Sequence, residues 1–164
     1  MSQSITPDYR DSLASAFRER ICEKLNITLF QHQRAWFCAS DGNLLLDIPD
    51  PSGTLVQLAD GTTTRWMTAP RPEGRARFLA LLGAYKIGKS FSAGLWAAGF
   101  ACIPDRRVSI IGLEYSICEP EFSYIIDMLL SEKGMGMKAK TVTNRPRAGD
   151  MFLELENGTR FEAK

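Results

Sequence analysis

The sequence is poor in the residues that build metal centres and disulfide frameworks. It has one histidine, His32, with no clustered carboxylate near it in the sequence, which argues against a metal role for this residue. The four cysteines form no C-x-x-C pair; they are Cys22, Cys38, Cys102 and Cys118. Together with the nucleotide motif described below, this spacing favours reduced thiols in a cytosol-like compartment over disulfides or zinc.

The chain also lacks a charge excess and a long hydrophobic run. Its formal net charge is +1, so any contact with nucleic acid would depend on local basic patches. The longest uncharged apolar run, Phe91 to Ile103, is too short to cross a bilayer. Residues 2–20 are polar and charged, unlike the apolar part of a signal peptide. With 45% hydrophobic residues in 164, we expect a soluble intracellular protein with room for one domain and a proper core.

The most informative stretch is a match to G-x-x-x-x-G-K-S, which would arise by chance in roughly 0.6% of chains of this length, given ordinary residue usage. Glycines let the backbone curl so that its N–H groups point at phosphate oxygens, and a following helix adds a favourable dipole. Lysine would then reach the β- and γ-phosphates, and serine would ligate Mg²⁺. The residues are Gly83, Ala84, Tyr85, Lys86, Ile87, Gly88, Lys89 and Ser90.

The surroundings of the motif favour the same interpretation. Phe78 to Leu82 is typical of a buried strand, Phe91 to Ile103 has helical length and is followed by Pro104, and Val108 to Gly112 is typical of a second strand. The sequence therefore predicts a β-α-β unit around a phosphate-binding loop, with ATP and Mg²⁺ as cofactors. The alternative is a glycine turn that carries an incidental lysine.

Two helices are predicted before the motif. In Asp11 to Leu25, the apolar residues Leu13, Phe17, Ile21 and Leu25 recur at intervals of four, with Arg18 and other charged residues on other faces, as in a packing helix. The stretch from Asn26 to Asp41 mixes aromatic and amide residues. The amides of Gln33 or Gln31 could read the edge of adenine, since an amide donates and accepts at once. Alternatively, its aromatic residues are core and the glutamines are solvated.

Between these helices and the motif we expect a structural segment and a hairpin. Asn43 to Asp50 is a short apolar run ending in acid, which we interpret as leading into a loop. Leu55 to Met67 is a hairpin candidate with Asp60-Gly61 at its turn. Pro70, Pro72 and Gly74 indicate a linker.

After the second core strand, Glu114, Tyr115 and Ser116 are expected in a loop at the functional rim, because ligands bind at the carboxyl ends of parallel strands. A helix is predicted from Glu119 to Leu130 and a loop over Ser131 to Gly149. Met151 to Lys164 is predicted as a hairpin with Asn157-Gly158 at its turn. Because the sequence stops within this hairpin, we expect an N-terminal piece of a longer protein that starts at Met1.

In this order of features, residues 27–164 resemble the N-terminal part of the ATPase domain of large terminase subunits, the motors that package DNA into phage heads. The resemblance implies an α/β fold: a helicase-like P-loop NTPase with a parallel sheet, flanking helices and hairpins, incomplete at its C-terminus. Residues 1–26 would form a separate helical segment. It further implies that Gln33 or Gln31 reads adenine, that Lys89 contacts phosphate, that Ser90 ligates magnesium, and that Tyr115 occupies the rim.

The chain departs from the family in two respects. Tyr85 stands where many terminases carry an arginine four residues before the lysine, and the Walker B acids, and thus the catalytic residues, lie outside this sequence. The implied function is ATP-driven translocation of double-stranded DNA in the host cell cytoplasm by a homo-oligomeric ring. A small terminase subunit and a portal protein would be partners, and an endonuclease domain would follow. Rival interpretations are a helicase-like DNA or RNA translocase and a nucleotide-binding assembly module without hydrolysis. By itself the chain is expected to hydrolyse ATP weakly or not at all.

Overall fold

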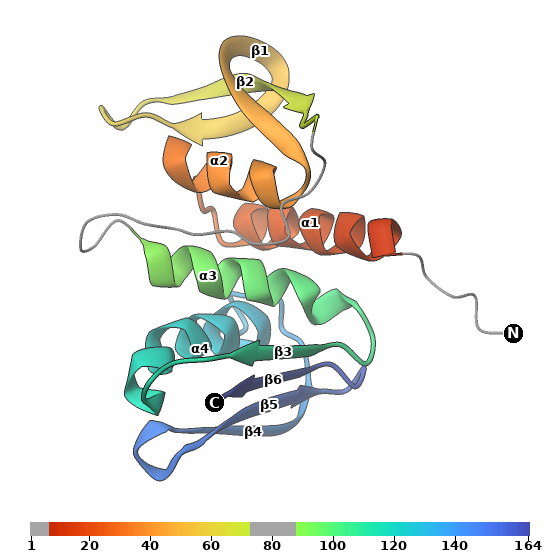
Figure 1. The fold of residues 1–164 in the computed structure, drawn as a ribbon, viewed down its shortest axis with the longest axis vertical. Helices are drawn as coiled ribbons and strands as arrows, with labels where there is room; N and C mark the ends of the chain where they lie inside the picture. The colour runs from red at the N-terminus through yellow and green to blue at the C-terminus, as the bar shows by residue number, and fades with distance from the viewer. Residues whose placement is uncertain (1–6, 73–87) are drawn as a thin grey trace, which may run out of the picture. The chain divides into compact units, whose positions relative to one another are not determined.

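The computed structural model describes residues 7–72 and 88–164, and it is a mixed α/β structure with two sheets (Figure 1). The chain divides into two compact units, one formed by residues 1–26 with 88–164 and the other by residues 27–87. The helix within residues 1–26 therefore belongs to the same unit as the C-terminal part of the chain. Within the described residues, no helix combines the length and apolar character needed to cross a membrane.

The first unit contains a four-stranded sheet in the order β3-β6-β5-β4. Strands β3 and β6 are parallel, whereas β6 with β5 and β5 with β4 are antiparallel, so the described sheet is mixed and not all-parallel. The predicted strand at 108–112 is confirmed as β3. The bounds are β3 Arg107–Ile110, β4 Ala139–Arg145, β5 Asp150–Leu155 and β6 Arg160–Ala163.

The region 131–149 is not the continuous loop that we expected. It contains β4 and a 3₁₀ turn, η2 (Pro146–Ala148). The Thr141-Val142-Thr143 run of β4 pairs with β5. This segment has few apolar side chains to bury, so backbone hydrogen bonds to β5 and the β-branched side chains account for its strand conformation.

The Asn157-Gly158 hairpin is confirmed between β5 and β6. Gly158 has φ of 86°, and the Leu155 amide donates to the Thr159 carbonyl at 2.9 Å to close the turn. Asn157 Nδ2 also donates to the Ala101 carbonyl at 2.7 Å, and the buried Thr159 hydroxyl donates to the Ile103 carbonyl. The turn is therefore tied to the segment that precedes β3.

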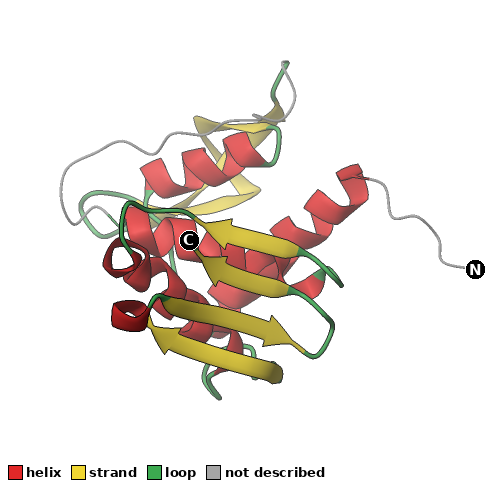
Figure 2. Cartoon of the chain, turned by 60° about the horizontal axis from the view of Figure 1, so that its bottom comes forward, coloured by secondary structure: helices red, strands yellow, loops and turns green. Residues whose placement is uncertain are grey.

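The helices of the first unit lie on one side of its sheet (Figure 2), and the last of them packs against all four strands. These helices are α1 Pro7–Lys24, α3 Lys89–Ala98 with its 3₁₀ extension η1 Gly99–Cys102, and α4 Tyr115–Leu130. Side chains that are fully buried between helices and sheet belong to alternate positions of β5 and β6 and to the inner stripe of α4; they are Leu153, Leu155, Phe161, Phe122, Ile125 and Leu129. No described element of this unit covers the other face of the sheet.

Helix α4 begins at Tyr115, several residues before the predicted start at Glu119. Pro120 was expected in the first turn because proline lacks an N–H donor. Instead it lies inside the helix, and Cys118, which precedes it, already faces the core. The earlier start is explained by burial of Cys118 on the same stripe as Phe122 and Ile125.

The first helix is confirmed, but its buried face is displaced from the predicted stripe. Ala14, Arg18, Ile21 and Cys22 are buried, and Arg18, which was expected away from the stripe, is only 2% exposed. The reason is close packing of α1 against η1: a Cβ placed on Gly99 would lie 2.8 Å from the Ala14 carbonyl oxygen. Because Ala14 and Gly99 are both small, the face of α1 that carries Ala14 and Arg18 turns toward η1 and is buried.

The second unit consists of one helix and one hairpin. Helix α2 (Gln31–Ser40) is followed by β1 (Asn43–Gln57) and β2 (Thr63–Pro70), which pair antiparallel. The predicted hairpin is confirmed, with Gly61 at φ of 86° in its turn. The run from Asn43 to Asp50 belongs to β1 and does not lead into a loop, because β2 continues past Met67 and pairs with it.

Candidate functional site

The described part of the predicted phosphate-binding motif forms the start of α3. Gly88 caps the helix with φ of 81° and ψ of 24°, a left-handed conformation that glycine adopts without strain. Lys89 and Ser90 occupy the first turn and are half-buried. The first helical hydrogen bond runs from the Ser92 amide to the Gly88 carbonyl at 2.9 Å. The first amides of a helix have no acceptor within the helix itself, and amides at this position are the groups that bind anions at helix N-termini.

Contacts with α4 hold α3 in place. The rings of Phe91 and Tyr124 meet edge to face, with centroids 5.4 Å apart. A Cβ on Gly94 would lie 2.9 Å from the Tyr124 Cβ and 3.0 Å from the Glu121 carbonyl oxygen, so the two helices approach closely there. Leu95 is fully buried beside this contact. The start of α3 therefore rests on a packed scaffold.

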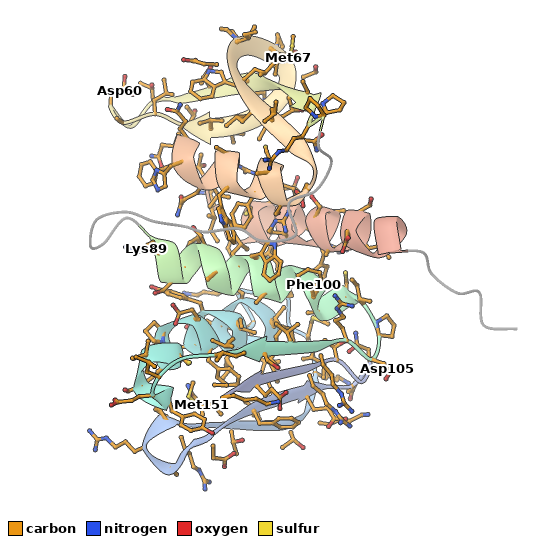
Figure 3. All side chains as sticks on the ribbon, viewed as in Figure 1. Asp60, Met67, Lys89, Phe100, Asp105 and Met151 are labelled. Carbon is orange, nitrogen blue, oxygen red and sulfur yellow. The ribbon has the colours of Figure 1, made fainter. Side chains whose placement is uncertain are left out.

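Within this unit, the start of α3 lies toward the edge of the sheet where β3 and β6 end (Figures 1 and 3). Lys89 is labelled at this end of α3 in Figure 3. Ligands of open α/β sheets bind outside the carboxyl ends of parallel strands. The position of Gly88, Lys89 and Ser90 is thus compatible with ligand binding.

The remaining motif residues, Gly83, Ala84, Tyr85, Lys86 and Ile87, lie outside the described residues, as does the predicted strand 78–82. Their roles therefore stay predictions. Ser90 is the one residue to which we assigned a metal. Within residues 7–72 and 88–164, no group of three or more histidine, cysteine, aspartate or glutamate side chains could hold a metal ion.

The two candidate adenine-reading glutamines behave differently on α2. Gln31 is exposed at the first position of the helix, whereas Gln33 is 5% exposed. Gln33 Oε1 accepts a hydrogen bond from the Phe30 amide at 3.0 Å, which caps the helix. Phe37, one turn later, is buried on the same face. Gln33 thus has a structural task that accounts for its burial.

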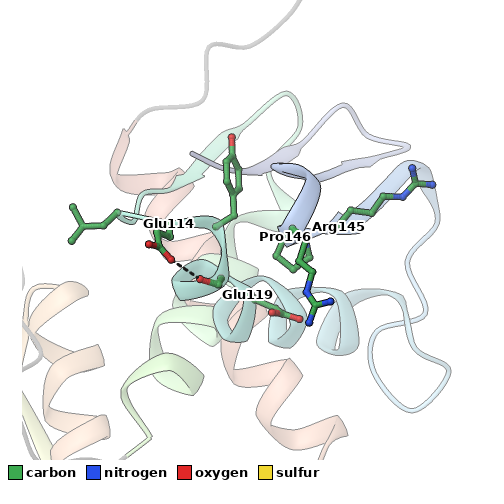
Figure 4. Close-up of a pocket in the computed structure, with 8 residues that line it drawn as sticks. Glu114, Glu119, Arg145 and Pro146 are labelled. Carbon is green, nitrogen blue, oxygen red and sulfur yellow. Dashed lines mark hydrogen bonds between the residues drawn. The ribbon is translucent and has the colours of Figure 1, made fainter.

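The predicted rim residues line an open hollow of about 930 Å³ at the start of α4 (Figure 4). Glu114 and Arg145 lie on opposite sides of it, with Pro146 beside Arg145. The Ser116 hydroxyl donates to Glu114 Oε2 at 3.3 Å. Tyr115 is half-buried, and its ring lies 3.1 Å from the point where a Cβ on Gly149 would sit, so a side chain there would press against the ring. The lining residues are Leu113, Glu114, Tyr115, Ser116, Glu119, Arg145, Pro146 and Arg147.

Arg145 and Arg147 were missed as site residues by sequence reasoning. They flank Pro146 in a region predicted as loop, and only the fold brings them to the same hollow as Glu114 and Glu119. The usable signal was the Arg-Pro-Arg sequence, which is followed by Ala148 and then by Gly149, whose φ of 66° ends the turn.

Beneath the start of α4, burial raises the pKa of the Cys118 thiol, and the nearby Glu121 carboxylate raises it further. The Sγ atom lies 3.9 Å from the Ile110 carbonyl oxygen, which it can reach as a weak donor. Cys118 is therefore expected to stay a neutral thiol, consistent with a packing role.

Comparisons with known protein families, with curated proteins and with solved structures found no match to this chain.

Proposed function

We propose that this chain is the ATP-binding portion of a viral DNA-packaging motor, a large terminase subunit with a P-loop NTPase fold. One observation carries the proposal: the G-x-x-x-x-G-K-S sequence ends in Gly88-Lys89-Ser90 at the start of α3. In a phosphate-binding loop this position must be the beginning of a helix. The left-handed Gly88 and the helical Lys89 and Ser90 support the proposal, because a phosphate-binding loop leads into a helix at its last residues.

The chain's own residues would bind and orient the triphosphate. The first-turn amides of α3 and the helix dipole would hold phosphate oxygens. Lys89 would contact the β- and γ-phosphates, and the Ser90 hydroxyl would hold magnesium. Bound Mg²⁺ supplies charge neutralisation at the phosphates. Gln33 or Gln31 remains the proposed contact with adenine.

The proposed activity of the intact protein is ATP hydrolysis coupled to translocation of double-stranded DNA. Catalytic acids outside this sequence would activate water, so this chain alone would bind nucleotide and hydrolyse it weakly or not at all. By resemblance, a homo-oligomeric ring, a small terminase subunit, a portal protein and an endonuclease domain complete the motor in the host cell cytoplasm.

Calorimetric titration of Mg-ATP into the chain tests the proposal. We expect binding by the unmodified protein and a loss of at least about tenfold in affinity for Lys89→Ala, since a charge-assisted phosphate contact is removed. Lys133→Ala removes an exposed lysine of the same unit beyond the end of α4 and should bind normally. Circular dichroism shows whether each variant is folded.

The outcomes separate the proposal from its rivals. No binding by a folded chain would contradict it and favour an assembly module. Equal affinity of Lys89→Ala and Lys133→Ala would also contradict it, because the lysine would then not contact phosphate. A helicase-like translocase predicts the same binding, and it is distinguished by a second motor domain, where a packaging motor has nuclease carboxylates.

A further inference from the structure

The open face of the four-stranded sheet carries a row of charged side chains where β3 and β6 begin. Arg107 on β3 is the register partner of Arg160 on β6, and Arg160 is the partner of Glu154 on β5. The next residue of β6, Phe161, is buried on the covered face, so this row lies on the open one. Lys140 of β4 joins the row, since its Nζ lies 3.5 Å from Glu154 Oε1. Cations from three strands therefore surround one carboxylate.

That carboxylate does not balance the cations around it. Arg160 Nη2 donates to Glu154 Oε1 at 3.4 Å, and Arg160 Nε lies 3.3 Å from Oε2 without forming a hydrogen bond. Glu154 thus divides one negative charge between two cations. In the part of the chain that the structure describes, Arg107 forms no ion pair, and Glu162 in the next row is paired with Lys164 at 2.9 Å. Positive charge is therefore in excess in the row of Arg107.

The position of Arg107 beside Arg160 is unfavourable for the sheet by itself. Like charges that face each other on neighbouring strands repel and lower stability. An anion bound at both guanidinium groups would reverse this effect, because each group would then be attracted to the negative charge between them. The repulsion therefore indicates a negatively charged ligand.

The same side chains line a depression of about 210 Å³, which accommodates a phosphate group. Its second carboxylate belongs to Asp105, in the connection before β3, which is labelled at this end of the sheet in Figure 3. The Asp105 Oδ1 atom occupies the space that a Cβ on Gly158 would need. Cations still outnumber carboxylates in the lining, which consists of Asp105, Arg107, Lys140, Glu154, Gly158 and Arg160.

We propose that this depression binds a phosphate group, with Arg107 and Arg160 as its guanidinium contacts and Lys140 as a third cation. Guanidinium groups suit this ligand, because their planar donors form paired hydrogen bonds with phosphate oxygens. The group is carried either by a small phosphate ester or by the backbone of double-stranded DNA, and both offer the same oxygens.

The site is separate from the proposed ATP site. Arg107 and Arg160 are the first residues of β3 and β6, whereas the start of α3 lies toward the edge where these strands end (Figure 1). Lys89 and Ser90 take no part in the depression. Either site can therefore fail while the other stands.

Nuclear magnetic resonance of the full chain carrying Lys89→Ala tests the proposal, because this variant removes a phosphate contact expected at the ATP site. Sodium phosphate replaces sodium chloride at constant ionic strength, so that general screening of charge stays the same. The Nε–H signals of Arg107 and Arg160 are followed during the titration. We expect both signals to shift and to reach a plateau.

Two neighbouring arginines supply a matched pair of variants. Arg107→Gln should weaken phosphate binding, followed at Arg160, by at least about fivefold, since one guanidinium contact is lost. Arg106→Gln removes the same charge one residue earlier, where the guanidinium lies over the Phe100 ring at 5.5 Å from its centroid and outside the depression. It should change the affinity by less than about twofold.

Thermal unfolding adds a measurement that a purely structural arginine would not explain. Without phosphate, Arg107→Gln should unfold at a higher temperature than the unmodified chain, because the repulsion with Arg160 is relieved. Added phosphate should stabilise the unmodified chain more than this variant, since only a bound ligand raises the unfolding temperature in this way.

A DNA duplex, titrated in place of phosphate, identifies the source of the group. Shifts of the same two signals at a lower concentration of phosphate groups would assign the site to the DNA backbone, whereas shifts with inorganic phosphate alone would assign it to a small phosphate ester. Both results support the site. Signals that do not saturate with either probe, equal affinities of Arg107→Gln and Arg106→Gln, or a lower unfolding temperature of Arg107→Gln without phosphate would overturn it.

Discussion

The unit formed by residues 1–26 with 88–164 and the unit formed by residues 27–87 bury their side chains in different ways. In the first, helices cover a four-stranded sheet, and Phe122, Leu153 and Phe161 are completely enclosed. In the second, one helix packs with a two-stranded hairpin, and Leu44, Ile48 and Met67 stay exposed. Two-stranded sheets are marginal by themselves. Stability should therefore depend mainly on the packing of buried side chains in the first unit, and on backbone conformation and backbone hydrogen bonds in the second.

The largest effect is expected in the core of the first unit. Phe161 on β6 is fully buried, so Phe161→Ala should lower the free energy of unfolding by about 3–5 kcal/mol. Phe152 on the neighbouring strand β5 is half-buried on the open face, and Phe152→Ala should cost only about 1 kcal/mol. Chemical denaturation followed by circular dichroism measures both. Equal losses would show that the covered face is not the core.

A smaller loss is expected from crowding the hairpin of the second unit. A Cβ on Gly53 would lie 2.2 Å from the Trp66 carbonyl oxygen, so Gly53→Ala should force β1 and β2 apart at a cost of about 2–3 kcal/mol. Gly61→Ala, in open space at φ of 86°, should cost about 1 kcal/mol through backbone strain alone. Hydrogen exchange should show the change within residues 27–87. A Gly53→Ala variant as stable as Gly61→Ala would contradict the close approach of Gly53 to the Trp66 carbonyl.

The cap of α2 provides a test at the level of one hydrogen bond. Gln33→Ala removes the acceptor for the Phe30 amide and should lower stability by about 1 kcal/mol. Gln31→Ala changes an exposed amide of the same helix and should leave stability unchanged. If the two variants lose the same stability in denaturation, the capping role is wrong. A separate loss of ATP affinity in either variant would identify the adenine-reading residue.

The smallest effect concerns pH. Hydrogen bonds from the Thr62 hydroxyl and amide lower the pKa of Asp60 in the hairpin turn. A lowered folded pKa means that the ionised form is favoured in the folded state. Its stabilising contribution is present above the ordinary value, 3.8, and is lost as pH falls through the lowered pKa. Asp60→Asn should flatten the acid dependence of stability below that value. If the pH dependence of stability in acid is the same in Asp60→Asn, that dependence arises from other carboxylates.

Much of the local structure could be predicted from the sequence, because short-range signals decide it. Asp60-Gly61 and Asn157-Gly158 fix two turns that need positive φ, and both hairpins form as predicted. The helix expected over 91–103, from its apolar length and the following proline, and the strand expected over 108–112 correspond to α3 with η1 and to β3.

Features decided by tertiary packing could not be predicted in the same way. The sequence of strand β4 has little apolar pattern. The strand forms because its backbone pairs with β5. Arg18 is buried because the Ala14–Gly99 contact turns α1, which no periodicity within the helix reveals. For the same reason, the arginines of the hollow were missed, because Arg145 meets Glu114 only across the fold.

The central claim is that phosphate binds at the start of α3, and hydrogen–deuterium exchange tests it most directly. The amides of Lys89, Ser90 and Phe91 should exchange more slowly when Mg-ATP is added, because phosphate oxygens would accept their hydrogen bonds. The same amides should show no such change in Lys89→Ala. Unchanged exchange at these three residues in a folded chain with saturating Mg-ATP would contradict the account.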